Sequence, residues 1–503
     1  MTSRTHALAA FLLCSIATEF FMILPAYADS AAIRECDLAA ASPEDNQRPI
    51  DVPGVTIESI IANSDAYVAA LSACEQAAAQ NPGNLRIAAE LARMLDKYEG
   101  LENTEAAARR VELNLKAATG GYVLGMLNIA RIYRHGAGVP KNIGEALKWL
   151  KIAANPPSNH RIAQFDLAEI YRTGDGVAAN LNVAGPLYCA SAESGFVPAM
   201  GQCGFANEFG HIGPADPDQA FIWYKKGAYL NDLVAKRQLA KAYRIGVGTT
   251  INNAMALEWA TTASNADDLE ARTVLGDIYY YGDGTPKDMG RAFGLYMSAS
   301  TQGDASAQAR LSNEYGNGYE IALNYNEAFR LAKLSAEGGN DEGLLSLGFY
   351  YDEGRGTTVD DVKAVELYRK SADLGNRGAM NNLGEMLIAG EGVERNANEG
   401  LEWLKKSSAA DYGYAPYNIA VHYEEQHEGF VYDSAVVAMN LIKALKLNHY
   451  RAVENLIAKG GKSFRKRTLR RLQEFMQADG KVFERRRDSL SPTAIAALQS
   501  YMP

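Results

Sequence analysis

The stretch Ala271-Arg-Thr-Val-Leu-Gly-Asp-Ile-Tyr-Tyr-Tyr-Gly-Asp-Gly284 holds the pattern that decides the fold of this chain of 503 residues. Its apolar side chains recur at intervals of three and four residues, which predicts an amphipathic helix. Gly282 and Gly284 predict the end of this helix and a tight turn, because glycine tolerates the positive φ of a helix C-terminal cap. The stretch therefore predicts one helix that turns into a second.

The same pattern recurs along the chain with a nearly constant period. The first glycine of a Gly-x-Gly element occurs at Gly136, Gly174, Gly246, Gly282, Gly354 and Gly390. A column of small residues has a first step of 38 residues and then a strict step of 36: Ala146, Ala184, Ala220, Ala256, Ala292, Ala328, Ala364 and Gly400. A large apolar residue stands three places after each: Trp149, Leu187, Trp223, Trp259, Leu295, Leu331, Leu367 and Trp403. Such a period predicts a structural repeat.

Each repeat is predicted to be an antiparallel pair of helices. A tyrosine column lies on the first helix of the pair, three residues before the first glycine: Tyr133, Tyr171, Tyr243, Tyr279 and Tyr351. The large apolar column lies on the second helix, at a position predicted to be in the core. Because one pair can bury its apolar face only against its neighbours, the sequence predicts an all-α, right-handed superhelical solenoid of antiparallel helix pairs.

The pattern A-x-x-x-L-G-x-x-Y-x-x-G-x-G followed by A-x-x-W resembles the Sel1-like repeat, a relative of the tetratricopeptide repeat. The fullest match to its first half is Ala271, Leu275, Gly276, Tyr279, Gly282 and Gly284. Two turns depart from the pattern: a longer turn is expected at Gly210-His-Ile-Gly213, and the glycines of Gly316-Asn-Gly318 are expected to slip by two residues. The resemblance implies an adaptor that holds protein partners together, often at the cell envelope.

Residues 1–28 are predicted to be a secretory signal peptide, because an apolar stretch is followed by Ala26-Tyr27-Ala28, a small-x-small cleavage site. The competing interpretation is an uncleaved membrane anchor. Cleavage predicts a periplasmic or secreted protein with no transmembrane segment in the mature chain. The formal net charge of −10 and a pI of about 5.4 give nucleic acid no general electrostatic reason to bind, so it is excluded as a partner.

Four segments follow the signal peptide. Residues 29–60 are expected to form an extended arm, because the closely spaced Pro43, Pro49 and Pro53 disfavour helix. Residues 61–118 are expected to be atypical capping helices that resemble the tetratricopeptide repeat, residues 119–460 the Sel1-like solenoid, and residues 461–503 a basic helical tail.

Four cysteines remain after the signal peptide, an even number in an oxidising compartment. They are Cys36, Cys74, Cys189 and Cys203. Of the three pairings, we favour the one between neighbours in sequence, Cys36 with Cys74 and Cys189 with Cys203. The alternative is four buried, free cysteines.

The basic tail admits two interpretations. A helix face exposed to solvent is the simpler one. The other is an electrostatic contact with an acidic partner, an anionic lipid or a cell-wall polymer. The tail also has a faint similarity to a small three-helix peptidoglycan-binding module, so an envelope protein attached to peptidoglycan through its tail is the alternative function.

Residues with the spacing of a catalytic or metal site are scarce. His422 and His427 are the closest pair of histidines, but on one helix their rings would point about 140° apart, so no metal site is predicted. The sequence has no nucleophile elbow and no phosphate-binding loop. We therefore predict no catalytic residue and no cofactor; an enzyme with an unrecognised site is the third hypothesis.

One column on the first helices is a candidate for partner binding. Arg134, Arg172 and Arg244 each directly follow a residue of the tyrosine column, and Tyr280 has the matching place in the next repeat. Arginine and tyrosine are enriched where proteins meet. The alternative is that these side chains serve solubility and pair with neighbouring carboxylates. The sequence thus predicts an exported, non-catalytic scaffold for unidentified protein partners.

Overall fold

The computed structural model describes residues 31–43, 45, 51–52, 54–56, 64–95, 104–447 and 449. The predicted signal peptide (1–28) and basic tail (461–503) lie outside the described residues. The chain divides into two compact units, 1–235 and 236–503. All regular elements in the described ranges are helices, so the predicted all-α class is confirmed.

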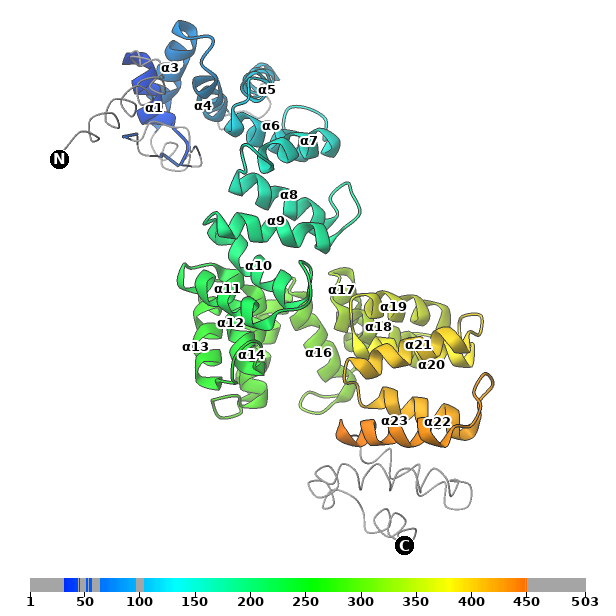
Figure 1. Cartoon of the computed structure of the whole chain (residues 1–503). Helices are drawn as coiled ribbons and strands as arrows, with labels where there is room; N and C mark the ends of the chain where they lie inside the picture. The colour runs from blue at the N-terminus through cyan, green and yellow to red at the C-terminus, as the bar shows by residue number, and fades with distance from the viewer. Residues whose placement is uncertain are drawn as a thin grey trace, which may run out of the picture. The chain divides into compact units, whose positions relative to one another are not determined.

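The first unit contains the helices up to α11 and the start of α12. Their bounds are α1 (Ala31–Ala40), α3 (Ser64–Gln80), α4 (Leu85–Leu95), α5 (Thr104–Thr119), α6 (Val123–His135), α7 (Ile143–Ala154), α8 (Arg161–Thr173), α9 (Leu181–Glu193), the short 3-10 helix η1 (Val197–Ala199), α10 (Met200–Glu208), α11 (Pro217–Tyr229) and α12 (Leu233–Ile245). From α1 to α11, each helix packs against the next described one in the sequence, as a solenoid requires (Figure 1).

The second unit continues the same arrangement. Its helices are α13 (Asn253–Ser264), α14 (Leu269–Tyr281), α15 (Met289–Thr301), α16 (Ala305–Asn317), α17 (Tyr325–Glu337), α18 (Asp341–Glu353), α19 (Asp361–Asp373), α20 (Arg377–Ala389), α21 (Ala397–Ala409), α22 (Tyr414–Glu425) and α23 (Ser434–Lys446). Consecutive helices again contact one another. The predicted solenoid of helix pairs is therefore confirmed in both units.

Residues 31–40 correct the prediction of an extended arm. They form helix α1, which packs against α3 and α4 and buries Ile33 and Cys36. The prolines from which an extended arm was inferred begin only at Pro43, after the helix has ended. The preceding Ala-rich run has high helix propensity, and burial of one face stabilises it.

The turn inside each pair is built from a left-handed glycine and a polar cap. Gly282 ends α14 with φ 78°, and six residues later Asp288 begins α15 by accepting a hydrogen bond from the backbone N–H of Arg291. The backbone N–H of Asp288 also donates to the carbonyl of Tyr279 at 2.9 Å. An Asn or Asp cap of this kind recurs at Asn142, Asn180, Asp216, Asn252, Asp288, Asn324, Asp360 and Asn396. Each cap satisfies backbone donors that a helix start leaves open.

The two turns that were expected to be irregular keep the period. Gly210 lies 36 residues after Gly174, and Asp216 lies 36 residues after Asn180, so the period is kept. The segment between the two helices, 209–216, is one residue longer than 174–180, because α10 ends at Glu208. Gly318 ends α16 with φ 65°, 36 residues after Gly282, whereas Gly316 lies inside the helix. The expectation of a slip was wrong because Gly316 is not a turn glycine. Its absent Cβ makes room for the side chain of Tyr350 instead.

The core position on the second helix lies one residue later than the sequence predicted. Most of the large apolar column is only half-buried, whereas the following residue is buried in every repeat. These buried residues are Leu150, Tyr188, Tyr224, Ala260, Tyr296, Ala332, Tyr368 and Leu404. The rings of Tyr224, Tyr296 and Tyr368 pack against glycines of the preceding helix; the Cβ of an alanine at Gly276 would lie 2.5 Å from Tyr296 Cε1. Glycine in the Leu-Gly motif thus makes room for a tyrosine.

Candidate protein-binding surface

The four residues of the predicted binding column lie near the C-terminal ends of first helices. Each is the next-to-last residue of its helix: Arg134 in α6, Arg172 in α8, Arg244 in α12 and Tyr280 in α14. All four side chains are partly exposed. Each of them also contacts a carboxylate.

In the first unit, two arginines of the column form ion pairs. Arg134 Nε lies 3.2 Å from Asp175 Oδ2, in the turn of the next pair. Hydrogen bonds from Lys141 and from Arg134 hold the pKa of Asp175 below its usual value. Arg172 instead pairs within its own helix, with Nη2 at 2.7 Å from Glu169 Oε2. Burial raises the pKa of Glu169, but the hydrogen bonds from Arg172 and Tyr188 outweigh it and lower the pKa overall.

In the second unit, the column connects neighbouring repeats. Arg244 Nε lies 2.7 Å from Asp283 Oδ2, and its Nη1 lies 3.2 Å from Asp277 Oδ2. The hydroxyl of Tyr280 donates to Glu314 Oε1 at 2.6 Å, and this hydrogen bond together with burial raises the pKa of Tyr280. Three of the four predicted residues therefore contact a carboxylate of the following helix pair. These contacts connect neighbouring repeats, so the three side chains have a structural role. Their predicted part in partner binding remains a prediction.

Asp277 is the centre of a buried network that the sequence analysis missed. Its carboxylate, 5% exposed, accepts from Arg244, from the hydroxyl of Tyr296 at 2.7 Å and from Arg310 Nε at 3.0 Å. Burial and the Asp277 charge raise the pKa of Tyr296. Arg310 also reaches Glu342 at 2.6 Å. The sequence does hold a signal for this network, because Asp277 is a charged residue inside the apolar run from Val274 to Tyr279.

Two exposed apolar side chains lie directly beside this network. Ile245 is 63% exposed at the end of α12, and Tyr281 is 59% exposed at the end of α14, at the same place in the next repeat. The guanidinium of Arg244 lies over the ring of Tyr281 at 5.1 Å, and the rings of Tyr280 and Tyr281 meet edge to face at 4.9 Å. We call Arg244, Ile245, Tyr280 and Tyr281 the Tyr281 patch.

The two neighbouring histidines correct the sequence analysis. The prediction that their rings point apart was wrong, because α22 ends at Glu425 and Gln426 has a φ of 55°, so His427 is not on the helix. The chain turns back, and His427 Nδ1 lies 2.7 Å from His422 Nδ1. The pair lines a pocket of about 480 Å³ together with Glu385, Arg395 and Glu428.

The four cysteines form two disulfides, with the pairing that the sequence favoured. Cys36 is bonded to Cys74 across 38 residues, and Cys189 to Cys203 across 14. Glu90 Oε2 lies 3.3 Å from Cys36 Sγ, and among the described residues only Cys36, Cys74 and Glu90 bring three potential metal ligands together. Because the two sulfurs are bonded to each other, neither is a thiolate that could bind a metal.

Among the described helices, none combines the length and the apolar character that a membrane span requires.

Comparison with known proteins agrees with the repeat. The family model described as Sel1 repeat matches residues 123–155, 161–196, 197–232, 233–268, 269–304, 305–340, 341–376 and 378–412, which together make up more than half of the chain. No curated protein is similar enough to count as a match.

Similar solved structures include two proteins with the same type of repeat. One is c5321, a protective antigen present in uropathogenic Escherichia coli strains and displaying an SLR fold; it is 22% identical, the match covers 84% of this chain and 97% of that chain, and the TM-score is 0.41. The other is a Sel1 repeat protein from Oxalobacter formigenes, 26% identical, with 63% of this chain and 90% of that chain covered and a TM-score of 0.38.

Proposed function

Because this chain belongs to the Sel1 repeat family, we propose that it is an exported, non-catalytic scaffold that holds protein partners on its repeats. Sel1 repeat proteins generally mediate protein–protein interactions, and their solenoids are generally not catalytic. Solenoids suit this task, since each added repeat extends the surface without disturbing the core. Two disulfides are compatible with the oxidising compartment that export implies.

The Tyr281 patch is the observation that carries this proposal. Tyrosine and arginine dominate the energetics of many protein interfaces, and both lie here beside an exposed isoleucine. Arg244 is fixed by Asp277 and Asp283, and Tyr280 by Glu314. Side chains that are already held lose little conformational freedom on binding, so a partner gains more from each contact. We therefore place the main contact on Ile245 and Tyr281, with Arg244 and Tyr280 supporting them.

Affinity capture from the exported fraction tests this function. The tagged full chain should retain specific proteins. Ile245→Ser combined with Tyr281→Ser should weaken the affinity for these proteins by about 30-fold and lower their recovery accordingly, since the loss of a hot spot costs roughly 2 kcal/mol. The matched control is Val359→Ser with Val362→Ser, which removes side chains that are 60% and 66% exposed elsewhere in the same unit.

Three results would count against parts of the proposal. If the unaltered chain retains no specific protein, the scaffold function is wrong. If the double variant at the patch and the control double variant lose the same amount, proteins bind but not at the Tyr281 patch. If cell fractionation finds the protein in the cytoplasm with its cysteines open to alkylation, the export part of the proposal is wrong. Circular dichroism should show the same helix content for all variants, because the replaced side chains are exposed.

A further inference from the structure

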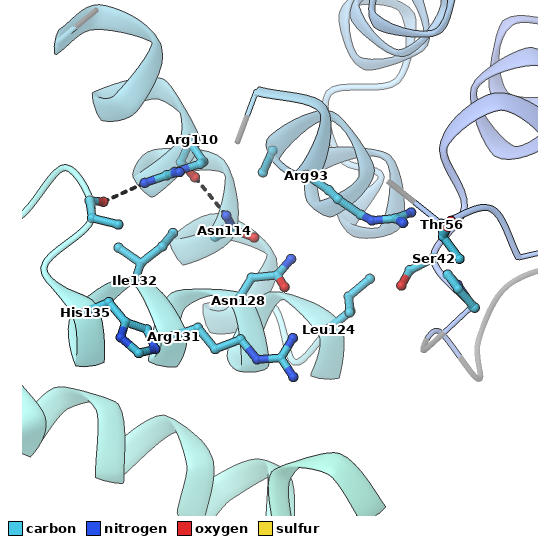
Figure 2. Close-up of a pocket in the computed structure, with 13 residues that line it drawn as sticks. Ser42, Thr56, Arg93, Arg110, Asn114, Leu124, Asn128, Arg131, Ile132 and His135 are labelled. Atoms are coloured by element: carbon cyan, nitrogen blue, oxygen red, sulfur yellow. Dashed lines mark hydrogen bonds between the residues drawn. The ribbon is translucent and has the colours of Figure 1, made fainter. Parts of the chain in front are cut away.

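Histidines line two pockets in the described part of the chain, and the two pockets differ in what else they hold. The first lies where α4, α5 and α6 meet the segment around Ser42, and it has a volume of about 440 Å³ (Figure 2). Its described lining contains one histidine, His135. Its arginines already bind protein atoms, as Arg131 binds Asp166 at 3.1 Å. Their charges are therefore not free for a ligand.

The second pocket, in the second unit, brings two histidines together. It has a volume of about 480 Å³, and the Nδ1 atoms of His422 and His427 face each other in its lining at 2.7 Å. The rest of its charged lining is three carboxylates and one guanidinium: Glu385, Glu391, Glu428 and Arg395. Because Arg395 pairs with Glu428, the two other carboxylates give the pocket a surplus of negative charge, which favours a cation.

Each histidine ring uses its other nitrogen to bind a carboxylate. His422 Nε2 lies 3.0 Å from Glu385 Oε1, and His427 Nε2 lies 3.0 Å from Glu425 Oε2. Carboxylates accept, so both Nε2 atoms donate, and the Nδ1 atoms are the ones that can offer a lone pair to another partner. A histidine that binds a metal almost always donates its second ring nitrogen in this way, which fixes the ring and makes the ligand more basic.

The backbone and a neighbouring ring hold the two histidines in position. His422 is 6% exposed, and its ring stacks on that of Phe430 at 5.1 Å. The N–H of His427 donates to the carbonyl of His422 at 3.2 Å, and the N–H of Phe430 donates to the carbonyl of His427 at 2.8 Å. The side chain of His427 is 42% exposed, so its ring has room to move while the turn keeps its backbone bonds.

We propose that the two Nδ1 atoms bind a divalent transition-metal ion, with Cu²⁺ preferred. The ion takes the place of the hydrogen between the rings, which leaves to water as a proton. Bonds of about 2.0 Å at a right angle would separate the two nitrogens by about 2.8 Å, whereas a tetrahedral angle would need about 3.3 Å. The square-planar geometry of Cu²⁺ therefore needs the smaller separation of the rings, and the exposed ring of His427 tilts to aim its lone pair at the ion.

Two further features complete the proposed site. Imidazole sites bind Cu²⁺ more tightly than the other divalent ions of the first transition row, which gives the same preference as the geometry. Water fills the coordination positions that the two histidines leave open. Glu385 and Glu425 are positioning residues, because they contact the rings and not the ion. The site adds a metal ligand to a chain whose proposed function concerns only protein partners.

Titration of the full chain, without a histidine tag, with copper sulfate tests this site by electron paramagnetic resonance. We expect one Cu²⁺ per chain, with hyperfine splitting from two nitrogens. His427→Gln should leave one nitrogen and weaken binding more than any other variant named here. Glu385→Ala should keep both nitrogens but weaken binding by about tenfold, because His422 loses the carboxylate that orients it. The matched control is His135→Ala, which removes the histidine of the first pocket and should change neither quantity.

Binding that does not saturate at one equivalent, or a spectrum that His427→Gln leaves unchanged, would mean an adventitious ion only and would overturn the site. Equal losses of affinity in His427→Gln and His135→Ala would overturn it as well. If circular dichroism shows that His427→Gln is unfolded, Glu385→Ala decides, because Glu385 lies on α20 and not in the turn. Unchanged affinity in Glu385→Ala would then overturn the proposal. The scaffold function is tested separately, by protein capture, and does not depend on these results.

Discussion

His422 Nδ1 lies 2.7 Å from His427 Nδ1, and each ring places its other nitrogen 3.0 Å from a carboxylate oxygen, of Glu385 and Glu425 respectively. Carboxylates accept, so both Nε2 atoms donate, and only one of the two facing Nδ1 atoms can carry a hydrogen. One Nδ1 therefore donates to the other. This contact holds the turn after α22 against the helix.

His427→Ala should loosen this end of the second unit. His422 is 6% exposed, and without its neighbour its Nδ1 would be a buried polar atom without a partner, which costs about 1–3 kcal/mol. Hydrogen exchange should become faster in α22 and in the turn up to Asp433, and stay unchanged in α14. Val431→Ala, which shortens a side chain that is 81% exposed in the same turn, is the control and should not change exchange. Equal exchange in both variants would rule out a structural part for the histidine pair.

Asp277→Ala should be among the most damaging single substitutions in the second unit. It leaves Arg244, Arg310 and the hydroxyl of Tyr296 without a shared acceptor, and breaking a buried charged network costs about 3–5 kcal/mol. Thermal melting, monitored by circular dichroism, should show that the second unit unfolds at a lower temperature. Asp267→Asn removes the charge of a carboxylate that is 95% exposed, at a φ of 62° that asparagine tolerates, and should melt within a degree or two of the unaltered chain. A melting curve for Asp277→Ala that overlays this control would show that the network contributes little.

Gly276→Ala and Gly294→Ala should change stability in opposite directions. A Cβ at Gly276 would lie 2.5 Å from the ring of Tyr296, so the ring or the helix must move, at a cost of about 1–3 kcal/mol. At Gly294, in the middle of α15, a Cβ meets no atom within 4 Å, and alanine favours helix over glycine by about 1 kcal/mol. Urea denaturation of the two variants and of the unaltered chain measures the free energy of unfolding, which should fall for Gly276→Ala and rise for Gly294→Ala. The packing argument fails if Gly276→Ala is as stable as the unaltered chain.

The period of the sequence was sufficient to predict the helix pairs, because small and large residues recur wherever helices must pack. The period predicted the buried position of the second helix one residue too early. Trp223, Leu295 and Leu367 satisfied the pattern, but the buried residue is the tyrosine that follows each of them. A helical period tolerates such an error, since neighbouring positions differ by only about 100° around the axis. The glycine opposite each tyrosine was visible in the Leu-Gly motif, but its partner could be identified only in three dimensions.

The contacts of the candidate site were harder to predict, because most of them join residues about 35 positions apart. Nothing local in the sequence indicates that Arg244 reaches both Asp277 and Asp283, or that Tyr280 reaches Glu314. The prediction that the rings of His422 and His427 point apart was wrong for a different reason. Five residues on one helix do separate two rings, but Gln426 in the left-handed region ended the helix between them. A single backbone residue changed the geometry of that pocket.

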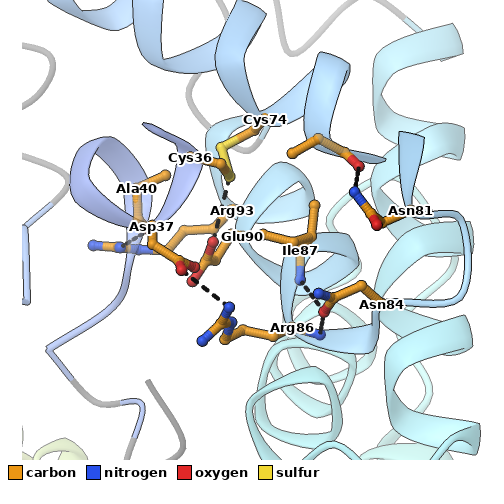
Figure 3. The surroundings of a disulfide bond; sticks show 11 residues. Cys36, Asp37, Ala40, Cys74, Asn81, Asn84, Arg86, Ile87, Glu90 and Arg93 are labelled. Atoms are coloured by element: carbon orange, nitrogen blue, oxygen red, sulfur yellow. Dashed lines mark hydrogen bonds and ion pairs between the residues drawn. A yellow bond between two sulfur atoms is a disulfide. The ribbon is translucent and has the colours of Figure 1, made fainter. Parts of the chain in front are cut away.

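Glu90 lies in a buried acidic cluster beside the first disulfide (Figure 3). Asp37 and Glu90 are both fully buried, and Arg86 pairs with Asp37 at 3.0 Å. Burial and the neighbouring Asp37 charge raise the pKa of Glu90 well above its usual value, although Arg86 acts in the opposite direction. The folded state thus keeps a proton on Glu90 at pH values where the unfolded chain has released it.

Glu90→Gln should therefore stabilise the N-terminal unit at neutral pH and not in acid. Below about pH 4 the carboxyl is protonated in both states, so its raised pKa costs nothing. As the pH rises towards the folded-state pKa, the unfolded chain binds fewer protons than the folded one, and stability falls. The amide cannot ionise, so at pH 7 the variant should be more stable than the unaltered chain, and this difference should vanish towards pH 4. Calorimetry between pH 4 and pH 8 measures this difference, with Glu75→Gln, a half-exposed carboxyl of α3, as control. Parallel curves for Glu90→Gln and the unaltered chain would mean that Glu90 has the same pKa in both states.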